Sequence, residues 1–167
     1  MPQETSARAP EATTDTRFVG FCDILGFSNR ILTDFDGTLK VYKEFAQVFS
    51  QVPAKEAEVT MYSDAILVTG NSVVSVACVV QNLWFTALVN DLMIRGAITK
   101  GRYWERREGN HMLVVSDALA RAVKLERSAG VPAVVIADDI EIPDEIWLTA
   151  LRTVRLRPLS CISAIGT

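Results

Sequence analysis

Residues 17–28 read RFVGFCDILGFS, and this stretch places an aspartate at the end of a predicted strand. The run Arg17–Cys22 is apolar after its first residue, which predicts a short strand in the middle of a sheet. Asp23 follows the run, Gly26 permits a sharp turn, and Ser28 is a residue type that caps helices. We therefore expect a strand, a turn and a helix, with a carboxylate at their junction.

A second aspartate lies at the tip of a predicted hairpin. The runs Glu58–Tyr62 and Ala65–Thr69 each read as a short strand, and only Ser63 and Asp64 separate them. If the hairpin neighbours the first strand, Asp23 and Asp64 emerge at the same edge of the sheet. Two carboxylates there repel each other unless a cation binds, and Mg²⁺ favours one or two carboxylates plus substrate phosphates. The spacing alone also fits two ordinary turn aspartates, so both interpretations stay open.

Phosphoryl transfer is the chemistry that such a pair would suit. Two divalent ions about 3.5–4 Å apart can bind the attacking and leaving oxygens of an in-line displacement at phosphorus. The turn at Ile24–Phe27 suits phosphates as well, because Gly26 lets the backbone approach closely and N–H groups at a helix start favour anions.

Composition limits the kind of protein further. The 167 residues, 49% of them apolar, are enough for one domain with a proper core. The net charge of −3 excludes a general basic surface for nucleic acid. The single histidine, His111, excludes a site with several imidazole ligands within one chain.

The ends and the apolar runs predict the cellular setting. Residues 1–16 are rich in Ala, Pro, Thr and Glu and lack an apolar signal core, so we expect a disordered leader before a domain at 17–167. The apolar run Val73–Leu92 contains polar residues and reads as a buried helix rather than a membrane span. Three scattered cysteines suit reduced thiols in a cytoplasmic protein: Cys22, Cys78 and Cys161.

The remaining pattern predicts an α+β fold, because hairpins alternate with helical crossovers. A helix after Ser28 is interrupted at Asp34–Gly37 and resumes over Leu39–Ser50. The other expected elements are a helix to Asn90, strands at Ile94–Thr99 and Met112–Val115 around a polar connection at Arg102–Gly109, a helix from Ser116 or Asp117 to Arg127, a strand at Ala133–Ala137, a short helix at Ile146–Leu151 and a short strand at Thr153–Leu156.

Four segments, in order, resemble the class III nucleotidyl cyclases. FCDILGFS at 21–28 resembles that family's F-x-D-I-x-G-F-[ST] metal motif, and YSDA at 62–65 falls where the family has its second metal aspartate. RGAITKGR at 95–102 resembles the family's next strand and turn, and ALARAVKLE at 118–126 resembles its helix of transition-state residues. The resemblance implies a ferredoxin-like, antiparallel or mixed sheet with helices packed on it, in a homodimer with sites at the interface.

The resemblance also implies roles for particular residues. Asp23 and Asp64 would bind two Mg²⁺ or Mn²⁺ ions, with the Ile24 carbonyl as a further ligand. Arg102 would bind the triphosphate, and the turn residues Gly26 and Phe27 would lie near it. The charge-stabilising residues would come from the other protomer. The family's arginine position holds Lys124, and Arg121, one residue after the asparagine position, is a candidate to supply the missing charge.

Departures from the family pattern bear on the substrate. Thr60 replaces the lysine that reads a purine, the second base-reading position falls near Leu113, and the ribose-binding asparagine falls at Ala120. Purine specificity is therefore not supported. The chain is similar to the stand-alone pyrimidine cyclases of bacterial Pycsar anti-phage systems, which implies conversion of UTP to cyclic UMP, or of CTP to cyclic CMP. Tyr62 fits either a core position or a base-stacking one.

Two alternative functions remain open at this level. The sequence ILTDFDGTL at 31–39 resembles the nucleophile motif of haloacid-dehalogenase-type phosphatases, with Asp34 as nucleophile and Asp36 as acid/base. The residues before this motif, Ser28–Thr33, have a helical rather than a strand-like pattern, which argues against a phosphatase. The second alternative is a catalytically inactive, cyclase-like binding module, which the changed positions Ala120 and Lys124 favour. Arg121 and Lys124 also fit an ordinary surface helix, and Arg95 fits a pair with an acid.

Overall fold

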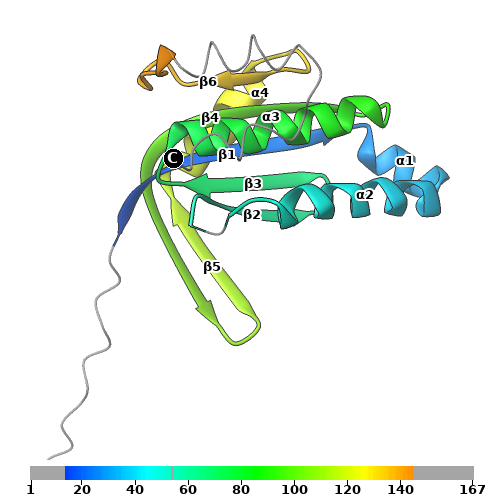
Figure 1. Ribbon diagram of the computed structural model, residues 1–167, viewed down its shortest axis with the longest axis horizontal. Helices are drawn as coiled ribbons and strands as arrows, with labels where there is room; N and C mark the ends of the chain where they lie inside the picture. Colours follow the sequence, from blue (N-terminus) through cyan, green and yellow to red (C-terminus); the bar gives the residue numbers. More distant parts are fainter. Residues whose placement is uncertain (1–13, 54, 145–167) are drawn as a thin grey trace, which may run out of the picture.

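The computed structural model describes residues 14–53 and 55–144, which form an α+β domain around one mixed sheet (Figure 1). The strand order is β2-β3-β1-β4-β5, with antiparallel neighbours, and β6 pairs with β4 in parallel. The strands are β1 (Asp15–Leu25), β2 (Ala57–Tyr62), β3 (Ala65–Gly70), β4 (Met93–Glu108), β5 (His111–Ser116) and β6 (Val134–Ile136). The helices are α1 (Phe27–Thr33), α2 (Phe35–Ser50), α3 (Val73–Val89) and α4 (Asp117–Ser128). The α+β prediction is confirmed.

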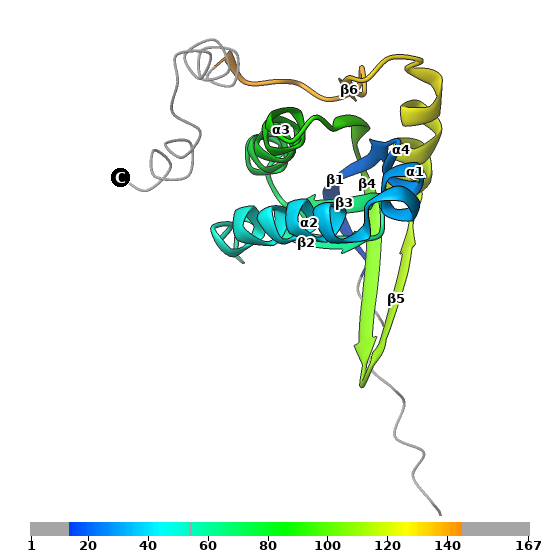
Figure 2. The same cartoon turned by 90° about the vertical axis from the view of Figure 1, so that its right-hand side faces the viewer.

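The helices cover the sheet from both sides, as the end-on view shows (Figure 2). The larger core cluster joins α2 and α3 to one face, and its members include Phe45, Leu83 and Ile24. A smaller cluster joins α4 to the other face through Ala118, Val19 and Tyr103. Because side chains alternate along a strand, Asp23 shares the face of Val19, on the side of α4.

The longest strand corrects one prediction. The polar connection expected at Arg102–Gly109 is instead the second half of β4, which pairs with β5 and turns only at Gly109 and Asn110. Neighbouring charges on this half pair with each other, as Arg107 does with Glu105. A strand that projects from the body of the domain is solvated on much of its surface, so charged residues are tolerated there. Figure 1 shows the β4–β5 hairpin extending beyond the rest of the sheet.

The segment around the first aspartate differs in its boundaries. β1 continues to Leu25, so Asp23 lies within the strand rather than after it. Gly26, with φ 74°, precedes α1, and Ser28 is inside that helix rather than its cap. A glycine takes this left-handed conformation without steric cost, which explains the abrupt change from strand to helix. The strand also begins at Asp15, inside the predicted leader.

Other predicted elements agree with the structure to within a few residues. The hairpin of β2 and β3 turns at Ser63 and Asp64, and the helix break occurs at Asp34, although α2 resumes at Phe35 rather than at Leu39. Ser116 caps α4 by accepting a hydrogen bond from the Leu119 N–H. The elements predicted at 146–151 and 153–156, and Cys161, lie outside the described residues. In the described part of the chain, no helix is long and apolar enough to cross a membrane.

Candidate active site

The structure brings Asp23 and Asp64 together, as the sequence predicts. Asp23 pairs with Ala65 across β1 and β3, so the hairpin turn lies against the end of β1. The Ile24 N–H donates a hydrogen bond to the Asp64 carbonyl over 2.9 Å, which fixes the turn in this place. The N–H and C=O of one strand residue point to the same side, so the Ile24 carbonyl also faces the turn.

Strand register places further predicted residues on the same face. Tyr62, Ala65, Asp23 and Arg95 are successive partners across β2, β3, β1 and β4. Strands lie ~4.8 Å apart, so Tyr62 is about 10 Å from Asp23. The Tyr62 side chain is 83% exposed, which excludes the core position that its sequence left open. Thr60 lies two residues earlier on β2 and therefore on the same face as Tyr62.

Negative charge at this end of the sheet is only partly compensated. The pKa of Asp23 is raised, first by burial and then by the nearby carboxylates of Asp64 and Glu126, while Arg95 acts in the opposite direction. An anion with a raised pKa is held in a place that favours a proton or another cation. The site is therefore suited to bind a cation.

The oxygen atoms at this place fit a hard divalent cation. Two carboxylates and the Ile24 carbonyl are the donor types that Mg²⁺ and Mn²⁺ prefer. Among the residues that the structure describes, no group of three or more His, Cys, Asp or Glu side chains could form a cage. Mg²⁺ sites with one or two carboxylates are completed by water and by substrate phosphates, so the small donor set is compatible with this ion.

This electrostatic strain predicts a gain in stability for Asp23→Asn. A carboxyl group whose pKa is raised on folding binds its proton more tightly in the folded state, so its contribution to stability falls as pH rises from the unfolded pKa to the folded one. At pH values above the folded-state pKa, the ionised Asp23 lowers the free energy of unfolding by a constant amount, and an asparagine does not. We expect the metal-free variant to melt at a higher temperature than wild type at neutral pH and to lose this advantage as the pH falls below the ordinary range of an aspartate pKa. Thermal unfolding in EDTA measures both values, and a variant that is less stable at neutral pH would contradict the expectation.

Arg95 is the basic residue nearest to this site in the register. Its Nε donates to the Glu126 carboxylate on α4, and its terminal nitrogen is 3.8 Å from Asp23 Oδ2. The expectation that Arg95 pairs with an acid is thus confirmed. Glu126 was missed as a site residue, although its position carried a signal. The buried residues of α4 are spaced by four, at Ala118, Ala122 and Glu126, so a charged residue falls on the apolar stripe.

Arg102 is not brought to the aspartates within one chain. It lies on β4 seven residues beyond Arg95, which is ~23 Å along a strand. Its backbone N–H and its Nε donate to Asp117 over 2.6 and 2.7 Å, and its side chain is 78% exposed. Phe27 is also unavailable as a side chain, because it is buried and packs against Tyr42. Only its backbone, next to Gly26, remains open to a substrate.

Arg121 and Lys124 line a separate cavity of about 550 Å³ between α4 and the segment after β6. Arg121 donates to the Lys100 carbonyl over 3.0 Å and to Asp139 over 2.7 Å. Neither Asp23 nor Asp64 lines this cavity. One chain thus keeps the aspartates apart from the two predicted cationic residues. The pairing of Arg121 with Asp139 could not have been predicted from sequence, because the two residues are 18 positions apart and no periodic pattern connects them.

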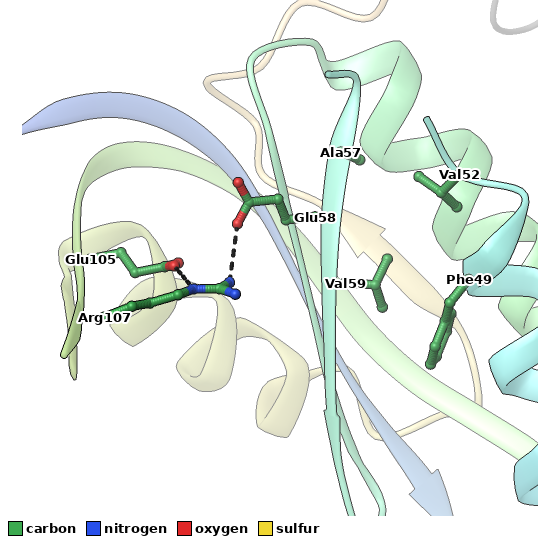
Figure 3. A pocket seen from close by; sticks show the side chains of 7 residues that line it. All are labelled: Phe49, Val52, Ala57, Glu58, Val59, Glu105 and Arg107. Atoms are coloured by element: carbon green, nitrogen blue, oxygen red, sulfur yellow. Dashed lines mark hydrogen bonds and ion pairs between the residues drawn. The ribbon is translucent and has the colours of Figure 1, made fainter. Parts of the chain in front are cut away.

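A second cavity, of about 440 Å³, lies between the hairpin half of β4 and the edge strand β2, and Glu105 and Arg107 line it from β4 (Figure 3). Arg107 lies there between two carboxylates, with Nε 2.6 Å from Glu105 and a terminal nitrogen 3.4 Å from Glu58. The guanidinium is therefore used for packing the hairpin against β2. Glu58 and Thr60 lie on the same face of β2, but Thr60 does not line this cavity.

The phosphatase-like motif has a structural role. Asp34 separates α1 from α2 and accepts a hydrogen bond from the Gly37 N–H over 2.9 Å, which is the geometry of a helix N-cap. A phosphatase nucleophile would directly follow a buried strand, whereas Asp34 follows a helix. The mostly antiparallel sheet also lacks the strand–helix alternation that such a fold requires.

Comparison with solved structures identifies the fold as that of class III cyclase domains. The adenylyl cyclase CyaB from P. aeruginosa superposes with a TM-score of 0.59 at 14% identity, over 86% of this chain and 83% of that one. A class III adenylyl cyclase-like ATP-binding protein from Pseudomonas aeruginosa gives 0.57 at 10% identity, over 75% of this chain and 34% of its own. The non-canonical dimeric guanylyl cyclase domain of the RhoGC fusion protein from the aquatic fungus Blastocladiella emersonii gives a TM-score of 0.55 at 16% identity, over 76% of this chain and 82% of that one.

Sequence comparison adds no further assignment. No family model matches the chain, and no curated protein matches its sequence. The predicted class III cyclase fold is confirmed by structure, while the identities of 10–16% limit the likeness to the fold itself.

Proposed function

We propose that this protein is a nucleotidyl cyclase that converts a pyrimidine nucleoside triphosphate to its 3′,5′-cyclic monophosphate and pyrophosphate. The observation that carries the proposal is the meeting of Asp23, Asp64 and the Ile24 carbonyl at one end of the sheet. Two Mg²⁺ or Mn²⁺ ions bound there would acidify the 3′-hydroxyl and offset the charge of the leaving group. In the reaction, the 3′-oxygen bonds to the α-phosphorus. The bond between the α-phosphorus and the oxygen that bridges to the β-phosphate breaks, so that pyrophosphate leaves, and the hydroxyl proton passes to solvent.

The residues around the aspartates have corresponding roles. Asp23 and Asp64 bind the cations, and Gly26 with the Phe27 backbone lies beside the phosphates. Lys124 and Arg102 would meet the triphosphate from a second protomer, because one chain holds them apart from the aspartates. A homodimer with two shared sites is therefore part of the proposal. Arg102 and Arg121 are weaker candidates than Lys124, since Asp117 and Asp139 already pair with their guanidinium groups.

The preference for a pyrimidine rests on the residues at the positions that correspond to the family's base-reading residues. Thr60 has no long cationic side chain to reach a purine ring, and Leu113, 49% exposed on β5, has no hydrogen-bonding group. Tyr62 offers an exposed ring on which a smaller base can stack. UTP is the first choice and CTP the second. A cytoplasmic second-messenger role in anti-phage defence follows from the resemblance to the Pycsar cyclases.

The experiment is to incubate the protein with each of the four ribonucleoside triphosphates and Mn²⁺ and to identify products by mass spectrometry. Cyclic UMP or cyclic CMP as the main product supports the proposal. A purine cyclic nucleotide would retain the reaction but reject the base preference. No cyclic product from any of the four would reject the proposed reaction.

One observation favours a second function, a nucleotide-binding module without turnover. Ala120 cannot make the ribose contact of the family's asparagine, and Arg121 is held by Asp139. A protein of the same fold is described as an adenylyl cyclase-like ATP-binding protein. This function predicts that the chain binds a nucleoside triphosphate, as measured by calorimetry, while the product assay stays negative.

A further inference from the structure

A buried carboxylate on α4 is linked to the metal-binding end of the sheet. Glu126 is 3% exposed and is the one charged residue among the buried side chains of the described residues. A carboxylate in such a place is stable only when it is paired and hydrogen-bonded. Its partner is Arg95, whose Nε donates to Glu126 Oε1.

The same guanidinium faces Asp23 without bonding to it directly. Arg95 and Asp23 are register partners on β4 and β1. The terminal nitrogen of Arg95 lies 3.8 Å from Asp23 Oδ2, beyond the 2.7–3.2 Å range of a hydrogen bond. Glu126 thus holds the guanidinium through Nε, while the neighbouring terminal nitrogen stays beyond hydrogen-bond distance of Asp23. The Asp23 oxygens remain free to bind another cation.

We propose that Glu126 and Arg95 are positioning residues for the metal ligand Asp23. Glu126 restrains the guanidinium so that it orients and partly neutralises Asp23 at ion-pair distance but does not close into a direct hydrogen bond that competes with the metal. This inference rests on the proposed function, since it presumes that Asp23 binds a divalent cation. Outer-shell partners of metal ligands commonly act in this way, by fixing the ligand and its charge.

Glu126→Gln removes the charge that restrains Arg95 and keeps the shape and an oxygen acceptor. The guanidinium is then expected to move toward Asp23 and to compete with the cation. We expect the Mn²⁺ concentration for half-saturation to rise about tenfold, while kcat at saturating Mn²⁺ changes little. Mn²⁺ binding is measured without nucleotide, from the electron paramagnetic resonance signal of the free ion, so that the readout does not depend on turnover.

A double-mutant cycle separates positioning from simple destabilisation. Arg95→Gln leaves a neutral donor for Glu126, and in that background Glu126→Gln is expected to change Mn²⁺ half-saturation less than twofold, because no cation is left to compete. Glu108→Gln is the matched control, since Glu108 pairs with Arg106 on the exposed hairpin. It should leave Mn²⁺ binding unchanged. If Arg95→Gln does not fold, the single variant and the Glu108→Gln control still decide the question.

Each result supports or overturns the inference. A tenfold weaker Mn²⁺ affinity for Glu126→Gln, absent from the Arg95→Gln background, supports it. If Glu126→Gln binds Mn²⁺ as tightly as wild type does, the positioning role is overturned and the proposed cyclase function stays intact. A wild-type protein that binds no Mn²⁺, alone or with a nucleoside triphosphate, overturns the metal site itself and both proposals with it.

Discussion

Asp23→Asn and Asp64→Asn are each expected to abolish formation of the cyclic product, with kcat lowered by about 10³-fold or more. Asparagine keeps the size and one oxygen of aspartate but removes the negative charge that holds a divalent cation. The two residues would share one cation in the proposed site, since the Ile24–Asp64 hydrogen bond sets the hairpin turn against β1. Losing either charge should therefore have nearly the same effect, and the double variant should be little worse than either single one.

The measurement is the rate of product formation at saturating Mn²⁺, with thermal unfolding as the check on folding. Asp34→Ser is the matched control, because serine also caps helices and Asp34 accepts a hydrogen bond from the Gly37 N–H in the structure. This variant should keep wild-type turnover. If Asp34→Ser lost activity while Asp23→Asn kept it, the phosphatase interpretation would return in place of the cyclase.

The local parts of this site were predictable from sequence because short-range chemistry determines them. Two residues between two strand-like runs leave room only for a tight turn, so Asp64 had to lie at a hairpin tip. Gly26 marks the change from strand to helix for a similar reason, because its φ of 74° is open to glycine and costly for other residues. The prediction at Asp23 was wrong only in the strand boundary, because β1 continues to Leu25 and Asp23 lies inside it. The two extra strand residues leave the carboxylate at the same edge of the sheet.

The parts that sequence did not predict depend on contacts between distant segments. Arg102–Glu108 reads as a polar loop because its charges conceal the strand, and only pairing with β5 makes it the end of β4. The link from Arg121 to Asp139 joins α4 to the segment after β6, and no spacing rule connects those positions. Glu126 is intermediate, because its place on the buried stripe of α4 was visible in the period of four, while its partner Arg95 was not.

A complementation experiment is expected to show that each site is built from two chains. In one chain, Lys124 lines a cavity that contains neither metal aspartate. If a second protomer supplies the lysine, Asp23→Asn and Lys124→Met should each be inactive alone and should recover activity when mixed. In a mixed dimer, one site combines both defects and the other combines Asp23 of one chain with Lys124 of the other.

The fraction of wild-type activity that returns on mixing follows from the proportion of mixed dimers. With free exchange, half of the dimers are mixed and each holds one intact site of two, so about a quarter of wild-type activity should return. Arg121→Met replaces Lys124→Met in a parallel series and should keep most activity by itself, because Asp139 already holds Arg121. Mixing Asp23→Asn with Asp64→Asn is the negative control, since both residues must come from the same chain. Recovery in that control, or none with Lys124→Met despite proven subunit exchange, would show that the site is not shared in this way.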